Sequence, residues 1–138
     1  MSCILRISGN AVDVDSLMAG CSLPANNVWR KGERRTVGGK IQSTSGLSFV
    51  VSEADFDEFD AQVVDATKFL VQHLAEISRL AAFSGVDFAL LDFGVSLYED
   101  TVAISCHLPP ALVRLAASAG LGLEVSYYAT SDEPESDS

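Results

Sequence analysis

Cys106 and His107 are the residues whose types most readily suggest catalysis. A cysteine thiolate can act as a nucleophile, and a neighbouring imidazole can act as its base. Both residues fall in the segment Thr101–Leu108, which we predict to be a strand, and adjacent residues of a strand point to opposite faces. We therefore expect Cys106 to be a core thiol and His107 to lie at the rim. The other histidine, His73, falls at the margin of the apolar stripe of a predicted helix, where we expect a half-buried or surface side chain.

The sequence does not indicate a metal site. Cys3, Cys21 and Cys106 are an odd number of cysteines at irregular spacing, and no pair has the short separation of a zinc knuckle. The ligands that would have to join His107 at a metal ion are absent from its neighbourhood. We expect no metal ion, no cofactor and no disulfide framework, and hence a reducing, cytoplasmic setting with free thiols.

Four acids, Asp55, Asp57, Glu58 and Asp60, lie at the start of the longest predicted helix. Negative charge is favourable there because the N-terminus of a helix carries a partial positive charge. Acid–base catalysis would instead need two carboxyls in one cleft with pKa values pushed apart. We expect these four acids to be solvated charges at the helix start.

Asp92 is different, because Leu90, Leu91 and Phe93 surround it in a segment that we predict to be a central strand. A buried carboxylate must be hydrogen-bonded or paired. We expect Asp92 to bind backbone donors of a neighbouring loop or to pair with Arg6, and a role in a binding site is the alternative.

Common enzyme motifs are missing from the chain. There is no Gly-x-Ser-x-Gly elbow, no Gly-x-x-x-x-Gly-Lys-Ser/Thr phosphate loop and no dinucleotide fingerprint. Lys40 follows two glycines, but it precedes Ile41 and no predicted helix. The sequence therefore assigns no catalytic residue and favours a protein that is not an enzyme.

One cluster of charge stands out. Five of the nine basic residues lie within the eleven residues 30–40, directly after the only tryptophan. This segment is either a solvated loop that leans on its own acidic surface or a recognition loop for an acidic partner or a phosphate. Trp29 either stacks on a ligand or anchors the core. The binding candidates are Trp29, Arg30, Lys31, Arg34, Arg35, Lys40 and Asp92.

The elements that must position these residues follow from the apolar pattern and its breakers. The long helix begins after Ser52 as N-cap and ends at Gly85. At about thirty residues it would be ~45 Å long, so we expect a bend or a projecting first turn. The strand that begins at Phe88 is expected to be covered on both faces, and a turn at Glu99 leads into the return strand 101–108. The other expected elements are a strand Cys3–Ser8, a helix Asp13–Gly20, a short strand beginning at Val28, a strand Gly46–Ser52, a helix Pro110–Gly120 and a strand Leu121–Tyr128.

The predicted fold class is α+β, a mostly antiparallel sheet with one long and two short helices packed on it. The predicted element order is β-α-β-β-α-β-β-α-β. We expect one domain over residues 1–128. Residues 129–138 are acidic and almost free of apolar groups, so we expect a disordered tail.

The 138 residues carry nineteen acids against nine bases, a formal net charge of −10. Such a surface repels phosphate backbones and anionic lipid, so we expect neither nucleic acid nor a membrane as partner. The N-terminal residues do not have the pattern of a secretory signal, and no apolar run approaches the ~20 residues that span a bilayer. A protein partner is expected, and the third hypothesis is a structural homodimer through an exposed edge strand or the far end of the long helix.

Several segments together resemble a bacterial family, domain-of-unknown-function family 4279. They are CILRISG (Cys3–Gly9), LPANNVWRKGE (Leu23–Glu33), SGLSFVVS (Ser45–Ser52), LDFGV (Leu91–Val95) and LPPALVRLA (Leu108–Ala116). The resemblance implies an intracellular bacterial α+β domain with no assigned reaction, and it carries no catalytic residues to this chain. Some relatives look like neighbours of toxin systems, which would suit a binding or immunity role.

Together these observations predict a non-enzymatic binding protein, of an immunity or accessory type, that acts by surface charge complementarity. The alternative is a small-ligand sensor or enzyme with a pocket between the long helix and the sheet, near Trp29, Asp92 and Tyr127.

Overall fold

The computed structural model describes residues 1–34 and 39–130. Their five strands form one sheet in the order β2-β3-β1-β4-β5. Every neighbouring pair is antiparallel except β4 and β5, which are parallel, so the predicted α+β class and mostly antiparallel sheet are confirmed. The elements are β1 Cys3–Gly9, α1 Val14–Ala19, β2 Asn27–Trp29, β3 Ser45–Ser52, α2 Phe59–Ala81, β4 Phe88–Tyr98, α3 Pro110–Ala119 and β5 Gly122–Thr130.

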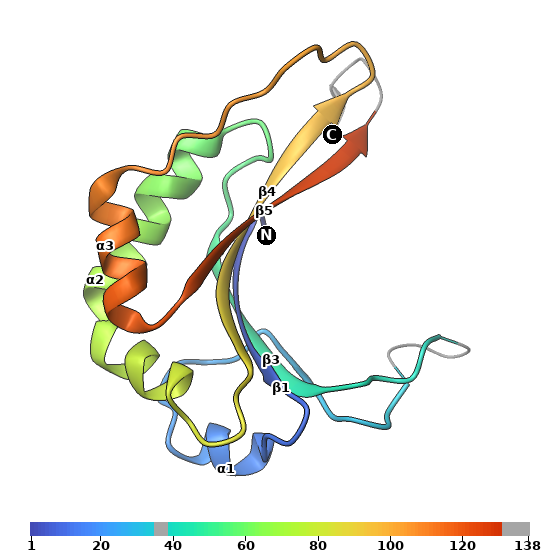
Figure 1. Ribbon diagram of the computed structural model, residues 1–138, viewed down its shortest axis with the longest axis vertical. Helices are drawn as coiled ribbons and strands as arrows, with labels where there is room; N and C mark the ends of the chain where they lie inside the picture. The colour runs from blue at the N-terminus through green and yellow to red at the C-terminus, as the bar shows by residue number, and fades with distance from the viewer. Residues whose placement is uncertain (35–38, 131–138) are drawn as a thin grey trace.

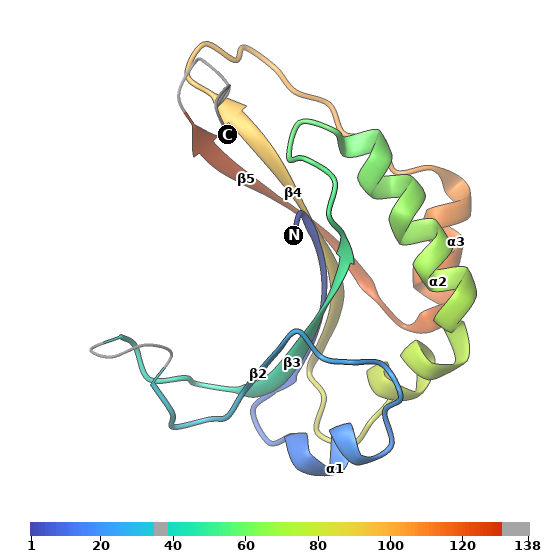
Figure 2. The ribbon, with the colours of Figure 1, turned by 180° about the vertical axis from the view of Figure 1, so that it is seen from behind.

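Two of the helices cover one face of the sheet, and no helix of the described residues covers the other. In both ribbon views α2 and α3 lie side by side against the convex side of a curved sheet (Figures 1 and 2). Helix α1 lies at one end, near the loop that leads into β4 (Figure 1). The concave side of the sheet faces away from α2 and α3.

The central strand β1 shows how the sequence makes these two faces. Cys3, Leu5 and Ile7 are fully buried, and they alternate with Ile4 and Arg6, which point the other way. The residues buried with them come from the helix-facing sides of β3 and β4 and from the apolar stripes of the helices. They include Leu47, Phe49, Leu91, Phe93, Val63, Ala66, Leu70, Ile77, Leu80, Leu112 and Ala116.

Helix α2 begins later than the sequence predicts. Ser52 was expected to cap it, but Ser52 ends β3, and its hydroxyl accepts from the amide of Ala54 and donates to Asp65 at 2.6 Å. This local bonding competes with helix formation, so residues 53–58 form a loop. The predicted bend is confirmed, because His73 has non-helical backbone angles (φ −122°, ψ 23°) in the middle of α2.

The predicted return strand 101–108 does not form. Strand β4 already has β1 on one edge and β5 on the other, so no edge of β4 is left for a hairpin partner. The chain does turn at Glu99, where the amide of Thr101 bonds to the carbonyl of Tyr98. It then runs as an extended crossover segment to α3, which β5 follows in parallel to β4.

Two further expectations need correction. Strand β4 was expected to be covered on both faces near Phe88–Phe93, but no helix of the described residues lies on its concave face, and Phe88 is 59% exposed. The strand β5 continues through Ala129 and Thr130, two residues that the composition predicts to belong to the acidic tail. The rest of that tail, 131–138, lies outside the described residues.

Local capping works as the sequence predicts at the two short helices. The carboxylate of Asp13 accepts from the amides of Asp15 and Ser16 at the start of α1, and these bonds lower the pKa of Asp13. Pro110 opens α3, and Gly120 ends it with the left-handed angle φ +79°.

No helix among the described residues is long and apolar enough to cross a bilayer.

Candidate functional site

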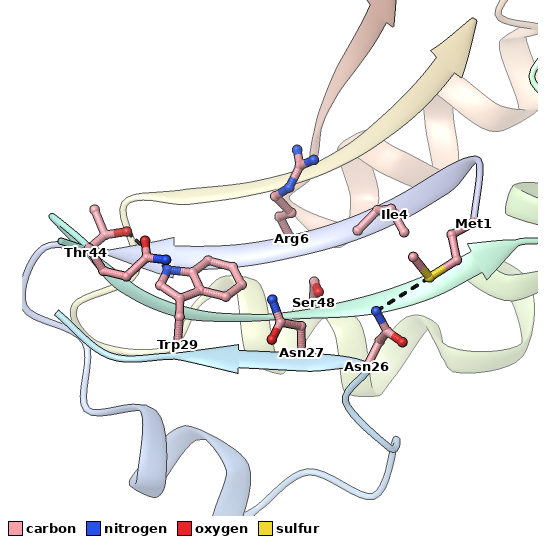
Figure 3. A pocket seen from close by; sticks show the side chains of 9 residues that line it. Met1, Ile4, Arg6, Asn26, Asn27, Trp29, Thr44 and Ser48 are labelled. Carbon is pink, nitrogen blue, oxygen red and sulfur yellow. Dashed lines mark hydrogen bonds between the residues drawn. The ribbon is translucent and has the colours of Figure 1, made fainter. Parts of the chain in front are cut away.

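The concave face of the sheet holds a group of polar side chains that comes from three neighbouring strands. Strand pairing places Arg6 of β1, Ser48 of β3 and Asn27 of β2 in one row across three strands. The adjacent row contains Trp29, opposite Gly46. These side chains surround a pocket of about 410 Å³, within the volume range of small-molecule sites (Figure 3). The residues that line the pocket are Met1, Ile4, Arg6, Asn26, Asn27, Trp29, Gln42, Thr44 and Ser48.

Asp92 holds Arg6 in place at one side of the pocket. Nη1 of Arg6 donates to Oδ2 of Asp92 at 2.8 Å, and the hydroxyl of Ser126 donates to the other carboxylate oxygen at 2.7 Å. Asp92 is only 4% exposed, whereas the side chain of Arg6 is 38% exposed. The predicted pairing of Asp92 with Arg6 is thus confirmed. The buried carboxylate orients a guanidinium group whose outer side faces solvent.

Trp29 forms the opposite wall, and two contacts fix its ring. The indole Nε1 donates to the hydroxyl of Thr44 at 3.3 Å. The ring also lies close over Gly46, because a Cβ built there would be 2.7 Å from Cζ2 of Trp29. A glycine at this position lets the indole rest against the sheet. Trp29 is not part of the core cluster, and its ring lines the pocket on the concave side.

The pocket does not lie where the small-ligand alternative placed it. Trp29 and Asp92 belong to the concave face, on the opposite side of the sheet from α2. Tyr127 is on the other side, paired with Val95 and next to Cys106. The three residues therefore do not share one cavity between the long helix and the sheet.

The basic segment forms an arm at the β2–β3 end of the concave face. We call residues 30–34 and 39–42 the basic arm. Its two legs are joined by backbone bonds from Gly32 to Gln42 and from Gln42 to Glu33, of 2.9 and 2.7 Å. In both ribbon views the legs extend from the sheet in the direction in which the concave face opens (Figures 1 and 2).

Three basic side chains of the arm have partners within the chain. Arg30 forms an ion pair with Asp15 at 2.7 Å, and Lys31 donates to the side-chain oxygen of Asn10 at 2.7 Å. Arg34 donates to the carbonyl of Gly39, and Lys40 is exposed. Two of these positive charges, those of Arg30 and Lys31, therefore contact side chains outside the arm, as the solvated-loop interpretation predicts. Arg35 lies outside the described residues.

The residues that first suggested catalysis are not brought together. Cys106 is half-buried beside Tyr127, outside the core cluster where it was expected, because its segment is not a strand of the sheet. Its thiol raises the pKa of Tyr127. His107 is exposed, as predicted, and the ring of His73 packs at a tilt of 58° against Phe69, with ring centroids 4.9 Å apart.

The four acids near α2 precede or open the helix, and none of them caps it through its side chain. Asp57 accepts the hydroxyl of Tyr98 at 2.7 Å, an interaction that raises the pKa of Tyr98. Glu58 accepts from the amide of Asp55, and His107 lies in the same surface hollow as Asp57 and Asp60. Among the described residues no group of three metal-binding side chains is arranged to hold an ion.

Cys3 is the most deeply buried thiol of the chain. Burial and the nearby charges of Asp92 and Asp65 raise its pKa far above the ordinary range. The thiol therefore stays protonated at neutral pH and belongs to the core.

Sequence reasoning missed the polar neutral side chains of the pocket. In the sequence, nothing distinguishes these residues (Asn27, Thr44 and Ser48) from ordinary solvent-facing residues of strands and loops. The available signal was the alternation of β1 and β3, which places Arg6 and Ser48 on the face opposite the core.

A scan against protein-family models, a search of curated proteins and a search of solved structures each found no match to this chain. The resemblance to domain-of-unknown-function family 4279 stays a prediction.

Proposed function

We propose that this chain is a non-enzymatic binding protein that captures an acidic protein partner through the basic arm and the concave face of the sheet. An immunity-type or accessory role suits this activity. The observation that carries the proposal is the position of the arm, whose described basic residues (Arg30, Lys31, Arg34 and Lys40) lie beside a broad sheet face that no helix of the described residues covers.

The charge distribution supports an acidic partner. The chain has a formal net charge of −10, yet five of its nine basic residues lie in residues 30–40. Complementary charge orients and speeds the encounter of two proteins. An acidic surface would be drawn to the arm and repelled by the rest of the molecule, so association would have one preferred orientation.

The shape of the sheet supports the same location. The concave face offers Trp29 and Arg6, residue types that are enriched in the energetic centres of protein interfaces. Both are held by contacts within the chain, so little side-chain entropy is lost when a partner binds. The arm would attract the partner, and the concave face would supply the close contacts.

Charge reversal on the arm tests this proposal. Arg34→Glu with Lys40→Glu should weaken the binding of a fluorescent poly-glutamate peptide by about tenfold at low salt, measured by fluorescence anisotropy. The matched control is Lys68→Glu with Arg114→Glu, two exposed helix positions. Each pair removes two positive charges and adds two negative ones, so both lower the net charge by four.

The control pair should change the affinity by about threefold or less, because its charges lie on the helices. If both pairs weaken peptide binding equally, binding depends only on the net charge of the protein. That result would contradict the proposed role of the arm in capture. Release of the peptide by inorganic phosphate, but not by chloride of equal ionic strength, would assign the arm to phosphate instead.

A further inference from the structure

The pocket between Arg6 and Trp29 has two walls that are already fixed in position. Asp92 and Ser126 set the orientation of the guanidinium group, and Thr44 and Gly46 set the plane of the indole. Ser48 lies between the walls, in the row that joins Arg6 to Asn27. Neighbouring strands are about 4.8 Å apart, so the backbones at Arg6 and Asn27 are about 10 Å apart across β3. The pocket volume of about 410 Å³ is enough for a ligand built on one flat ring.

Among the side chains that line the pocket, the charge is positive and comes from Arg6. Arg6 is the one charged side chain among the described residues that line it, and the others are apolar, amide or hydroxyl groups. A guanidinium has five N–H donors in a planar fork, and Arg6 uses one of them on Asp92. The remaining donors match the two oxygens of a carboxylate.

We propose that this pocket binds a small free acid in which a carboxylate is carried on a planar ring. The carboxylate pairs with the outer side of the Arg6 guanidinium, and the ring packs on the indole of Trp29. The amides of Asn26 and Asn27 accept or donate hydrogen bonds at the rim. This ligand site goes beyond the capture of a protein partner, and the pocket proposal does not depend on the basic arm.

Trp29 is the only tryptophan of the chain, so its fluorescence reports on this pocket alone. Benzoate is the probe, and benzamide is its neutral counterpart of nearly the same shape. We expect benzoate to change the Trp29 emission saturably, with a dissociation constant of about 0.1–1 mM, as suits a small ligand in a half-open site. Benzamide should bind at least tenfold more weakly, because it lacks the charge that pairs with Arg6.

Two matched variants place the effect in the pocket. Asn27→Asp adds a negative charge at the exposed rim, and it should weaken benzoate binding about tenfold. Gln72→Glu makes the same chemical change on the outer side of α2 and should leave binding within about twofold. Arg6→Lys keeps a positive charge for Asp92 but loses the planar fork, and it should also weaken binding. If that variant does not fold, the comparison of Asn27→Asp with Gln72→Glu still tests the proposal.

Equal responses to benzoate and benzamide, or equal weakening in the two amide-to-acid variants, would overturn the proposal. Binding of a capped Glu-Phe dipeptide without any binding of benzoate would also overturn it, because the acid would then come from a protein partner. Loss of poly-glutamate binding on arm reversal with intact benzoate binding would leave the pocket proposal standing. The experiments therefore distinguish a failure of the arm proposal, seen in poly-glutamate binding, from a failure of the pocket proposal, seen in benzoate binding.

Discussion

Replacement of Arg6 by methionine is expected to lower the free energy of unfolding by about 2–3 kcal/mol. The change leaves the carboxylate of Asp92 buried, with only the hydroxyl of Ser126 as a partner. Breaking a fully buried ion pair in this way costs about 3–5 kcal/mol, and the partial exposure of Arg6 reduces that figure. Urea denaturation of the variant and the parent protein measures the difference.

A double-mutant cycle provides the control. Asp92→Asn keeps the shape of the side chain and still accepts the Ser126 bond, so Arg6→Met combined with Asp92→Asn should restore stability to within about 1 kcal/mol of the parent. The coupling between the two positions should then be at least about 1–2 kcal/mol, because the loss caused by Asp92→Asn alone adds to it. Simple additivity of the two single changes would show that the pair does not act as a unit. The cycle thus separates the cost of an orphaned charge from the net contribution of the pair.

Gly9→Ala is expected to destabilise the protein by about 3 kcal/mol, for a reason of space. A Cβ at Gly9 would be 2.0 Å from the carbonyl oxygen of Gly85 and 3.0 Å from the amide of Asp87. Both are backbone atoms of the turn that leads into β4. That turn also bonds to the end of β1 through the amide of Asp87 and the carbonyl of Ser8 at 2.9 Å. The clash can be relieved only if the turn moves away from β1.

Gly122→Ala is the matched control, since the nearest atoms to its added Cβ are 3.9 Å away. It should change the free energy of unfolding by no more than about 0.5 kcal/mol. Thermal and urea unfolding of the two variants, under one set of conditions, compare them directly. If both variants lose a similar amount of unfolding free energy, the loss comes from backbone flexibility and not from the close approach of β1 to the turn.

The sequence predicts those elements of the fold whose signals are local. The alternation of β1, the Asp13 cap of α1, and Pro110 and Gly120 at the two ends of α3 all depend on neighbours a few residues away. The errors arise where distant contacts decide. The 101–108 segment alternates like a strand, but the parallel pairing of β5 with β4 occupies the edge it would need.

The same distinction applies to the candidate site. The pairing of Arg6 with Asp92 could be predicted because both residues interrupt apolar surroundings and each needs a partner. The pocket could not be predicted, because it depends on β1, β3 and β2 lying in that order with Trp29 folded over Gly46. A serine at position 48 has no local feature that distinguishes it from any other strand serine.

The arm and the pocket give the concave face two complementary properties. The arm supplies long-range attraction that salt screens, whereas the pocket supplies short-range contacts that are already oriented. A partner or ligand that uses both would be acidic and would present a flat group.

Mapping of a bound acidic peptide by NMR tests the recognition surface most directly. In a two-dimensional amide spectrum of the labelled protein, a short poly-glutamate peptide should shift the single indole resonance of Trp29 together with the amides of Asn27, Ser48 and the arm. The amides of α2 and α3 should stay in place. Shifts confined to α2, α3 or the 101–107 segment, with an unmoved indole resonance, would contradict recognition by the concave face.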